Sequence, residues 1–211
     1  MVAGLGVYRP VDLGGVPPEA LRVGDARIGP EIAAKGSIVL PMIKVLRQNR
    51  ERALEVLPAE LHHYLDERII VTHWYPGGEH HRLTQALGEL VDGNWEMLGR
   101  GLALAELTGA YRHVLKPREP VRTLRALPGL WKLNHNTGEL DVQWKAPIVT
   151  VTISGWGLAL QEHVSIMRAY MLQLLELCEA VNPSVRVTRH EPPPNSLVIV
   201  ESEFEEPGPA S

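Results

Sequence analysis

Apolar residues recur at helical spacing through the first half of the chain. A first helix is predicted over residues 31–48, where Ile32, Val39 and Ile43 fall on one face. Pro41 lies inside this segment and predicts a kink, because proline cannot complete the helical hydrogen-bond ladder. Further helices are predicted over residues 52–57, 59–65, 79–91, 95–115 and 121–131, and a short strand or a buried turn over 69–73.

In the second half the period changes from helical to two. Leu140, Val142 and Trp144 alternate with polar residues, as in a half-buried strand, and residues 148–153 form a β-branched run. A long helix is then predicted over residues 160–181, followed by alternation over 184–190 and 197–204. The order of elements predicts an α+β fold. Its N-terminal half is helical, and a β-β-α-β-β half follows whose antiparallel sheet of about four strands packs against helices.

The 211 residues are expected to form one domain with two irregular ends. Residues 1–30 are rich in Gly and Pro and are predicted to form an extended arm, with a short strand near Leu5–Tyr8. The single α+β domain is expected over residues 31–204, and residues 205–211 are predicted to be a frayed tail. The arm could pack along the domain or reach a second subunit.

Composition excludes several classes of protein. The net charge of −4 disfavours nucleic-acid binding, and Cys178 is the only cysteine, which excludes an intramolecular disulfide and a four-thiolate zinc site. No apolar run is long enough for a membrane span, and the first residues do not resemble a secretory signal. We therefore expect a cytoplasmic protein.

Small residues follow one face of the predicted helix over 95–115. Gly101, Ala105 and Gly109 are spaced so that another backbone can approach closely. The pattern favours tight helix packing, and a ligand groove is the alternative.

The chain has nine histidines, and their spacing does not favour a metal site. His62–His63 and His80–His81 are adjacent pairs, whose side chains diverge by about 100° on a helix and cannot chelate together. We predict that His80 and His81 lie on a solvated face; metal binding by this pair is the alternative. No cofactor and no metal are predicted.

His163 has a different setting from the other histidines. It shares the apolar side of the helix over 160–181 with Met167 and Tyr170. A buried histidine needs a hydrogen-bond partner, so His163 is either a satisfied core residue or a polar group lining an apolar cavity. Trp156 stands in a Ser-Gly-Trp-Gly loop that is either a tight turn or an anion site made of backbone N–H groups. The predicted ligand-binding residues are His163, Met167, Tyr170, Trp156 and Arg100.

A second candidate site is basic. Arg118, Arg122 and Arg125 have i, i+4, i+7 spacing, which predicts a helical arginine face for an anion or an acidic partner. The alternative is that these arginines balance the protein's own acidic C-terminal residues. No Gly-x-Ser-x-Gly motif and no acid/base pair of carboxylates are present, and Cys178 lies in an apolar helical run. A non-enzymatic protein is therefore predicted.

Several short motifs resemble a family of roughly 200-residue proteins of unknown function, found as paralogues in myxobacteria. These motifs are Lys35-Gly36, Trp74-Tyr75-Pro76, Leu98-Gly99-Arg100, the run Leu124–Trp131 and the β-β-α-β-β ending, and the resemblance covers residues 34–204. In element order that family is similar to a superfamily of 4-vinyl-reductase sensor domains, heme–nitric-oxide-binding domains and TRAPP vesicle-tethering subunits. The resemblance implies an α/β sandwich, often dimeric, used for small-molecule sensing or protein assembly.

The chain departs from each branch of that superfamily. The Tyr-x-Ser-x-Arg motif of the heme branch is absent. The 4-vinyl-reductase branch holds zinc partly through cysteines, and this chain has only one cysteine, Cys178. An acyl chain, as in some TRAPP subunits, would require Cys178 to line a cavity. The resulting hypothesis is a ligand-sensing or signalling module that self-associates as a homodimer and binds a small apolar or anionic ligand or a protein partner. The alternative is a scaffold protein that uses its arm and helix faces for contacts.

Overall fold

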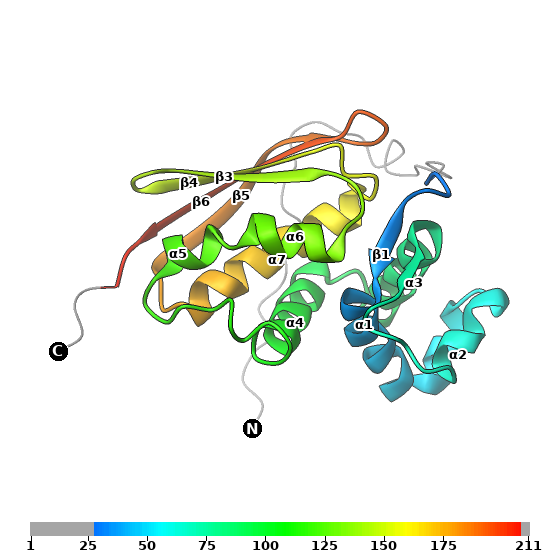
Figure 1. Ribbon diagram of the computed structural model, residues 1–211. Coiled ribbons are helices and arrows are strands. Elements are labelled where there is room, and N and C mark those ends of the chain that lie inside the picture. The colour runs from blue at the N-terminus through cyan, green and yellow to red at the C-terminus, as the bar shows by residue number, and fades with distance from the viewer. Residues whose placement is uncertain (1–27, 208–211) are drawn as a thin grey trace, which may run out of the picture.

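In the computed structural model of the protein, residues 28–207 are described (Figure 1). The helices are α1 (Gly36–Gln48), α2 (Arg50–Val56), the 3-10 helix η2 (Ala59–Leu65), α3 (Gly77–Leu90), α4 (Trp95–Leu107), α5 (Pro120–Leu124), α6 (Leu127–Asn134) and α7 (Gln161–Leu177). The strands are β1 (Ala33–Lys35), β2 (Trp74–Pro76), β3 (Glu139–Lys145), β4 (Ile148–Ser154), β5 (Val181–Glu191) and β6 (Leu197–Glu205). The predicted α+β class and the β-β-α-β-β order of the second half are confirmed. The strand predicted near Leu5–Tyr8 lies outside the described residues.

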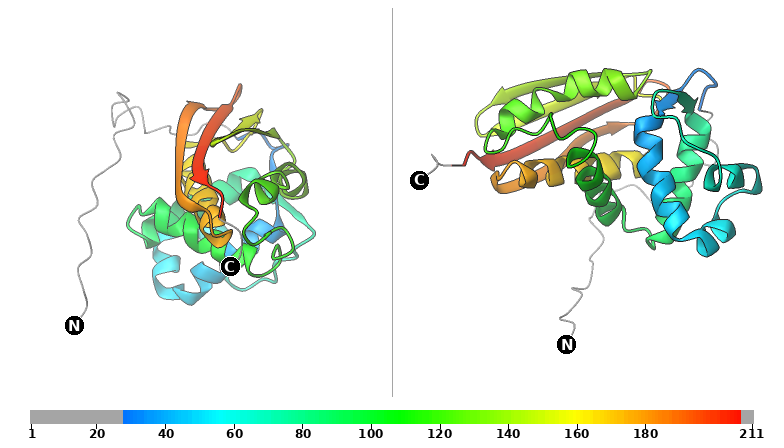
Figure 2. Two further views of the ribbon diagram at one scale, coloured as in Figure 1. Left: turned by 90° about the vertical axis from the view of Figure 1, so that its left-hand side faces the viewer. Right: turned by 60° about the horizontal axis from the view of Figure 1, so that its bottom comes forward.

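The main sheet has four antiparallel strands in the order β3-β4-β6-β5. Along β4, Val149, Val151 and Ile153 are fully buried, while the residues between them are partly exposed. This alternation buries one face of the sheet, and helices α5, α6 and α7 lie beneath that face in Figure 1. Helices α1, α2 and α3 gather at one end of the sheet, as the right-hand view of Figure 2 shows, beside the two-stranded sheet β1-β2.

Several predicted boundaries are wrong for local reasons. The helix predicted over 121–131 is two helices, because Pro128 stands in the first turn of α6 and cannot continue a helix that arrives from α5. Of the two alternatives for residues 69–73, the structure has the turn, although residues 70–73 are exposed, and a strand follows them as β2, paired with β1. Strand β6 extends through Glu205, the first residue of the predicted tail, where it pairs with Val181, and residues 208–211 of that tail lie outside the described residues. None of the described helices is long and apolar enough to cross a bilayer.

Helix α4 packs directly on α7, although not through the predicted small-residue face. A Cβ atom on Gly99 would lie 2.4 Å from the Ile166 carbonyl oxygen and 2.8 Å from Ala169 Cβ, so the two backbones meet at Gly99. A Cβ atom on Gly101 would meet nothing within 4 Å. The prediction that Gly101 marks a close helix contact is therefore wrong, since the contact lies two residues earlier on a different face.

The pair Gly99 and Gly101 gives a matched test of this packing. Gly99→Ala should lower the free energy of unfolding by about 1–3 kcal/mol, because the added methyl group overpacks the contact between α4 and α7. Gly101→Ala should leave stability unchanged or raise it by up to about 1 kcal/mol, because alanine favours the helix and the position is open. Urea unfolding of both variants checks this, and equal effects of the two substitutions would contradict the packing described.

Candidate functional site

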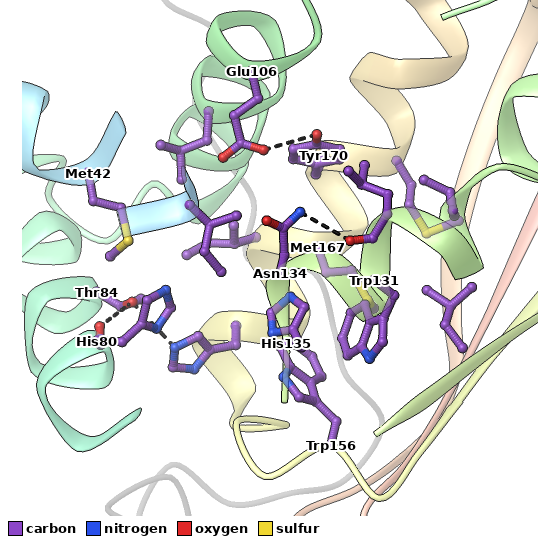
Figure 3. A pocket seen from close by; sticks show the side chains of 18 of the residues that line it. Met42, His80, Thr84, Glu106, Trp131, Asn134, His135, Trp156, Met167 and Tyr170 are labelled. Carbon is purple, nitrogen blue, oxygen red and sulfur yellow. Dashed lines mark hydrogen bonds between the residues drawn. The ribbon is translucent and has the colours of Figure 1, made fainter. Parts of the chain in front are cut away.

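A cavity of about 170 Å³ lies between the helices and the buried face of the main sheet. Figure 3 shows side chains from α1, α3, α4, α6 and α7 converging on it. Most of its lining is apolar and includes Met42, Leu87, Leu102, Leu127, Val151, Met167 and Met171. A similar volume, about 150 Å³ of apolar cavity in an engineered protein, accepts benzene or xenon. The cavity is therefore large enough for one small molecule.

Four of the five predicted ligand-binding residues line this cavity. His163, Met167 and Tyr170 reach it from α7, and Trp156 reaches it from the loop after β4. Arg100 is not among the lining residues: its Nη1 atom donates a 2.6 Å hydrogen bond to Glu176 Oε2, so it joins α4 to α7 outside the cavity.

His80 lies in the core, and the prediction that it is solvated is wrong. Its exposed fraction is 7%, because the first turns of α3 pack against α7 and place its ring 5.4 Å from the ring of His163, centroid to centroid. His81 is also largely covered, with its Nδ1 atom 3.6 Å from a carboxylate oxygen of Glu162. No group of three or more His, Cys, Asp or Glu residues within 28–207 is arranged to hold a metal ion.

The tautomer of His163 follows from its neighbour Thr84. The Thr84 hydroxyl donates its single hydrogen to the His80 carbonyl oxygen at 2.9 Å, since a carbonyl can only accept. Thr84 Oγ1 also lies 3.3 Å from His163 Nε2, so in this contact Nε2 must carry the hydrogen and donate it. In the neutral imidazole the other nitrogen, Nδ1, is then an acceptor, and it has no partner among the described residues.

The cavity histidines are neutral at pH 7. Burial lowers the pKa of His80 to about 4 and the pKa of His135 to about 3, because a charged imidazolium loses its hydration there. Burial also holds the pKa of His163 well below its ordinary range, and the neighbouring histidines lower it further.

Glu106 on α4 is a lining residue that the sequence interpretation missed. It is 8% exposed, and its Oε2 atom accepts a 3.1 Å hydrogen bond from the Tyr170 hydroxyl (Figure 3). Burial raises the pKa of Glu106 to about 8, which the bond from Tyr170 only partly opposes, so at pH 7 the side chain is mainly a neutral carboxylic acid. The available signal was its position one turn after Leu102, within the apolar side of the helix.

Asn134 at the end of α6 fixes the part of the lining next to Glu106. Its Oδ1 atom accepts hydrogen bonds from the Ser37 hydroxyl at 2.7 Å and from the Tyr111 hydroxyl at 2.8 Å. Its Nδ2 group donates to the Leu130 carbonyl oxygen at 3.1 Å. The amide therefore ties α6 to α1 and to the segment after α4.

An open groove of about 740 Å³ runs between α1 and α4 on the other side of these residues. The small residues Gly101 and Ala105 line this groove. Their position agrees with the alternative prediction, in which this helix face borders a groove instead of another helix. Leu102, Glu106 and Asn134 line both the groove and the cavity, and we call these three the wall residues. They separate the cavity from the groove.

The basic segment does not form the predicted helical arginine face. Arg118 precedes α5, which contains only Arg122 of the three, and Arg125 follows it as the C-cap. Arg118 pairs with Glu179 at 3.1 Å and Arg122 with Glu119 at 3.0 Å, while the Arg125 guanidinium lies 5.7 Å from the ring centroid of Trp144. Binding of an anion or an acidic partner by these arginines stays a prediction.

Two further candidates are occupied by local contacts. In the Ser-Gly-Trp-Gly loop, Gly155 has a φ of 68°, and its N–H donates to the Ser196 carbonyl oxygen at 2.9 Å, which favours the tight turn over an anion site. Cys178 is fully buried, and its thiol donates to Thr123 Oγ1 at 3.3 Å. It is not among the residues that line the cavity, so the condition for an acylated cysteine is not met.

The fold matches solved structures of H-NOX domains, while comparisons with family models and with curated proteins give no match. An H-NOX domain from a study of H-NOX activation superimposes with a TM-score of 0.62 at 17% identity, covering 84% of this chain and 100% of the other. An oxygen-binding H-NOX domain related to soluble guanylate cyclases gives 0.60 at 16% identity, covering 82% and 96%. A mutant H-NOX from T. tengcongensis gives 0.60 at 16% identity, covering 82% and 98%.

These matches define the chain as a protein with an H-NOX-like fold. They agree with the predicted relation to the heme–nitric-oxide-binding branch in element order. The resemblance to the myxobacterial family stays a prediction.

One of the matching structures comes from work on heme distortion in the H-NOX family. The described residues of this chain do not fit a heme group. The cavity of about 170 Å³ is smaller than the roughly 300–1,000 Å³ that drug-sized ligands occupy, and a porphyrin is at least that large. No Lys or Arg lines the cavity to pair with propionate groups, and the Tyr-x-Ser-x-Arg motif is absent from the sequence.

The raised pKa of Glu106 predicts a pH-dependent stability. Between its ordinary pKa of 4.5 and the folded value of about 8, the folded state holds a proton that the unfolded state has released. The contribution of Glu106 to the free energy of unfolding is therefore complete below pH 4.5, and it is lost as the pH rises through 8. Between pH 6 and pH 9, the free energy of unfolding of the wild type should therefore fall by about 3 kcal/mol more than that of the Glu106→Gln variant.

Urea unfolding at both pH values measures this difference. Glu89→Gln, on the exposed side of α3, is the control. Its free energy of unfolding should change between the two pH values as that of the wild type does. If the Glu106→Gln variant shows the same pH dependence of its free energy of unfolding as the wild type, the Glu106 carboxyl group is ionised in the folded protein at neutral pH.

Proposed function

We propose that this protein is a non-enzymatic ligand-sensing module that holds one small molecule in the cavity between its helices and its sheet. The observation that carries the proposal is the cavity itself, about 170 Å³ of mostly apolar lining with a few polar groups. Small-molecule sites have this composition, in which apolar walls supply affinity and a few polar groups fix orientation. The H-NOX-like fold supports the proposal by analogy, since one such domain is described as oxygen-binding.

Binding rather than catalysis is favoured by the chemistry of the lining. Glu106 and Tyr170 are hydrogen-bonded to each other, and burial raises the pKa of both. The lining contains no serine, cysteine or lysine that could act as a nucleophile.

The position of the cavity suits a sensor. Its lining comes from α1 and α3, which lie at one end of the sheet, and from α4, α6, α7, β3 and β4, which belong to the sheet and the helices packed against it. A ligand that contacts both groups of elements favours the arrangement in which they are close, so binding shifts the conformational population. The wall residues place the groove next to the cavity, so the outer surface along α1 and α4 would respond to occupancy.

Self-association is the second part of the proposal, and exposed apolar side chains beside the groove favour it. Met97 is 52% exposed and Leu133 is 62% exposed. Clustered exposed apolar residues mark interaction surfaces.

A cavity-filling substitution tests the ligand site. Val151→Phe adds a ring on the inner face of β4 and should abolish binding of methylcyclohexane, measured as a ligand-dependent rise in the melting temperature. Thr152→Phe adds the same ring on the outer face of that strand and should keep the wild-type response. If wild type shows no response, or if both variants keep it, the cavity is not a ligand site.

Leu133→Glu tests self-association. The wild type is expected to sediment as a dimer at micromolar concentration and the variant as a monomer, because a charge placed in a contact between copies must lose its hydration. Leu54→Glu, on the exposed side of α2, is the control and should remain dimeric. A monomeric wild type would end this part of the proposal.

A further inference from the structure

Four ring nitrogen atoms around the cavity are buried without a hydrogen-bond partner among the described residues. They are Nδ1 of His80, His135 and His163 and Nε1 of Trp156. All four side chains line the cavity. More than about 90% of buried polar groups in folded proteins are satisfied, so four unsatisfied atoms around one cavity point to a ligand that partners some of them.

Two of these atoms have a defined hydrogen-bonding role. Trp156 Nε1 can only donate, and its side chain is 4% exposed. His163 Nδ1 is an acceptor, because Thr84 holds the hydrogen of this imidazole on Nε2. The two rings are neighbours, with centroids 6.1 Å apart. A single polar group that both donates and accepts therefore complements this side of the cavity.

The charge balance of the cavity limits the ligand further. Its lining includes no Lys or Arg, and its one acidic residue, Glu106, is mainly neutral at pH 7. An anion placed there would lie in an apolar site without a counter-charge, which costs several kcal/mol. A cation would first require the buried carboxyl group to ionise.

We infer that the cavity selects a small uncharged molecule with a hydrocarbon body and one hydroxyl-like group, which donates to His163 Nδ1 and accepts from Trp156 Nε1. The body packs against apolar side chains such as Met42, Leu102 and Val151. This inference rests on the proposed function and specifies its ligand class. It sets aside, for this cavity, the anionic ligand considered from the sequence.

A series of cyclohexane derivatives tests the inference on the full chain at pH 7. Titration calorimetry should show cyclohexanol binding about 30-fold more tightly than methylcyclohexane, the increment expected of two net hydrogen bonds. Cyclohexanecarboxylate and cyclohexylammonium should each bind at least about 100-fold more weakly than cyclohexanol.

The variant His163→Phe keeps an aromatic ring and removes the acceptor. It should lower the ratio of cyclohexanol affinity to methylcyclohexane affinity about fivefold, because the Trp156 donor remains. His113→Phe, at an exposed position, is the control and should keep the wild-type ratio. If His163→Phe does not fold, Trp156→Phe removes only the indole donor and should lower the same ratio.

The outcomes separate the two proposals. Equal binding of methylcyclohexane and cyclohexanol would overturn the hydroxyl assignment and leave the ligand site in place. Binding of the carboxylate or the ammonium as tight as that of the alcohol would overturn the uncharged class. If no member of the series binds, both the ligand site and its class fail.

Discussion

The contact between α4 and α7 at Gly99 is the constraint on which the rest of the site depends. Because residue 99 has no side chain, the two helices approach until Ile166 and Ala169 lie against the backbone of α4. One further turn of the helix brings Leu102 to the cavity, and the next brings Glu106 to the Tyr170 hydroxyl. The same crossing thus positions an apolar wall and a buried carboxylic acid. A bulkier residue at position 99 would separate the helices and disturb both.

Much of the fold could be predicted from the sequence where the periodicity is strong and local. The alternation over Leu140–Trp144 and the β-branched run after it correspond to β3 and β4, and the long helix before the second hairpin is α7. Boundaries were missed where tertiary contacts decide them. The helix over 95–115 ends at Leu107, and the face with Gly101 and Ala105 lines a groove instead of packing. Spacing identifies a small-residue face but cannot say whether another element covers it.

The site was predicted in part for a similar reason. An apolar stripe with one histidine pointed to His163, and the structure places it in the lining with its helical neighbours Met167 and Tyr170. His80 was missed because its own helix reads as polar, and its burial comes from α7, which is 79 residues away at the Thr84–His163 contact. Arg100 was also among the predicted ligand-binding residues, but its hydrogen bond to Glu176 holds it outside the cavity. Long-range pairing of this kind leaves no local pattern in the sequence.

One fold can carry different sites. The chain shares its architecture with H-NOX domains at 16–17% identity, yet its cavity is small, bordered on one side by the wall residues and without cationic lining. The most direct test is a crystal structure of the protein under xenon pressure. One xenon site is expected among Met42, Leu102 and Val151, in an apolar cavity of the size described. A structure with no xenon there, and with side chains collapsed into that space, would contradict the existence of a ligand cavity.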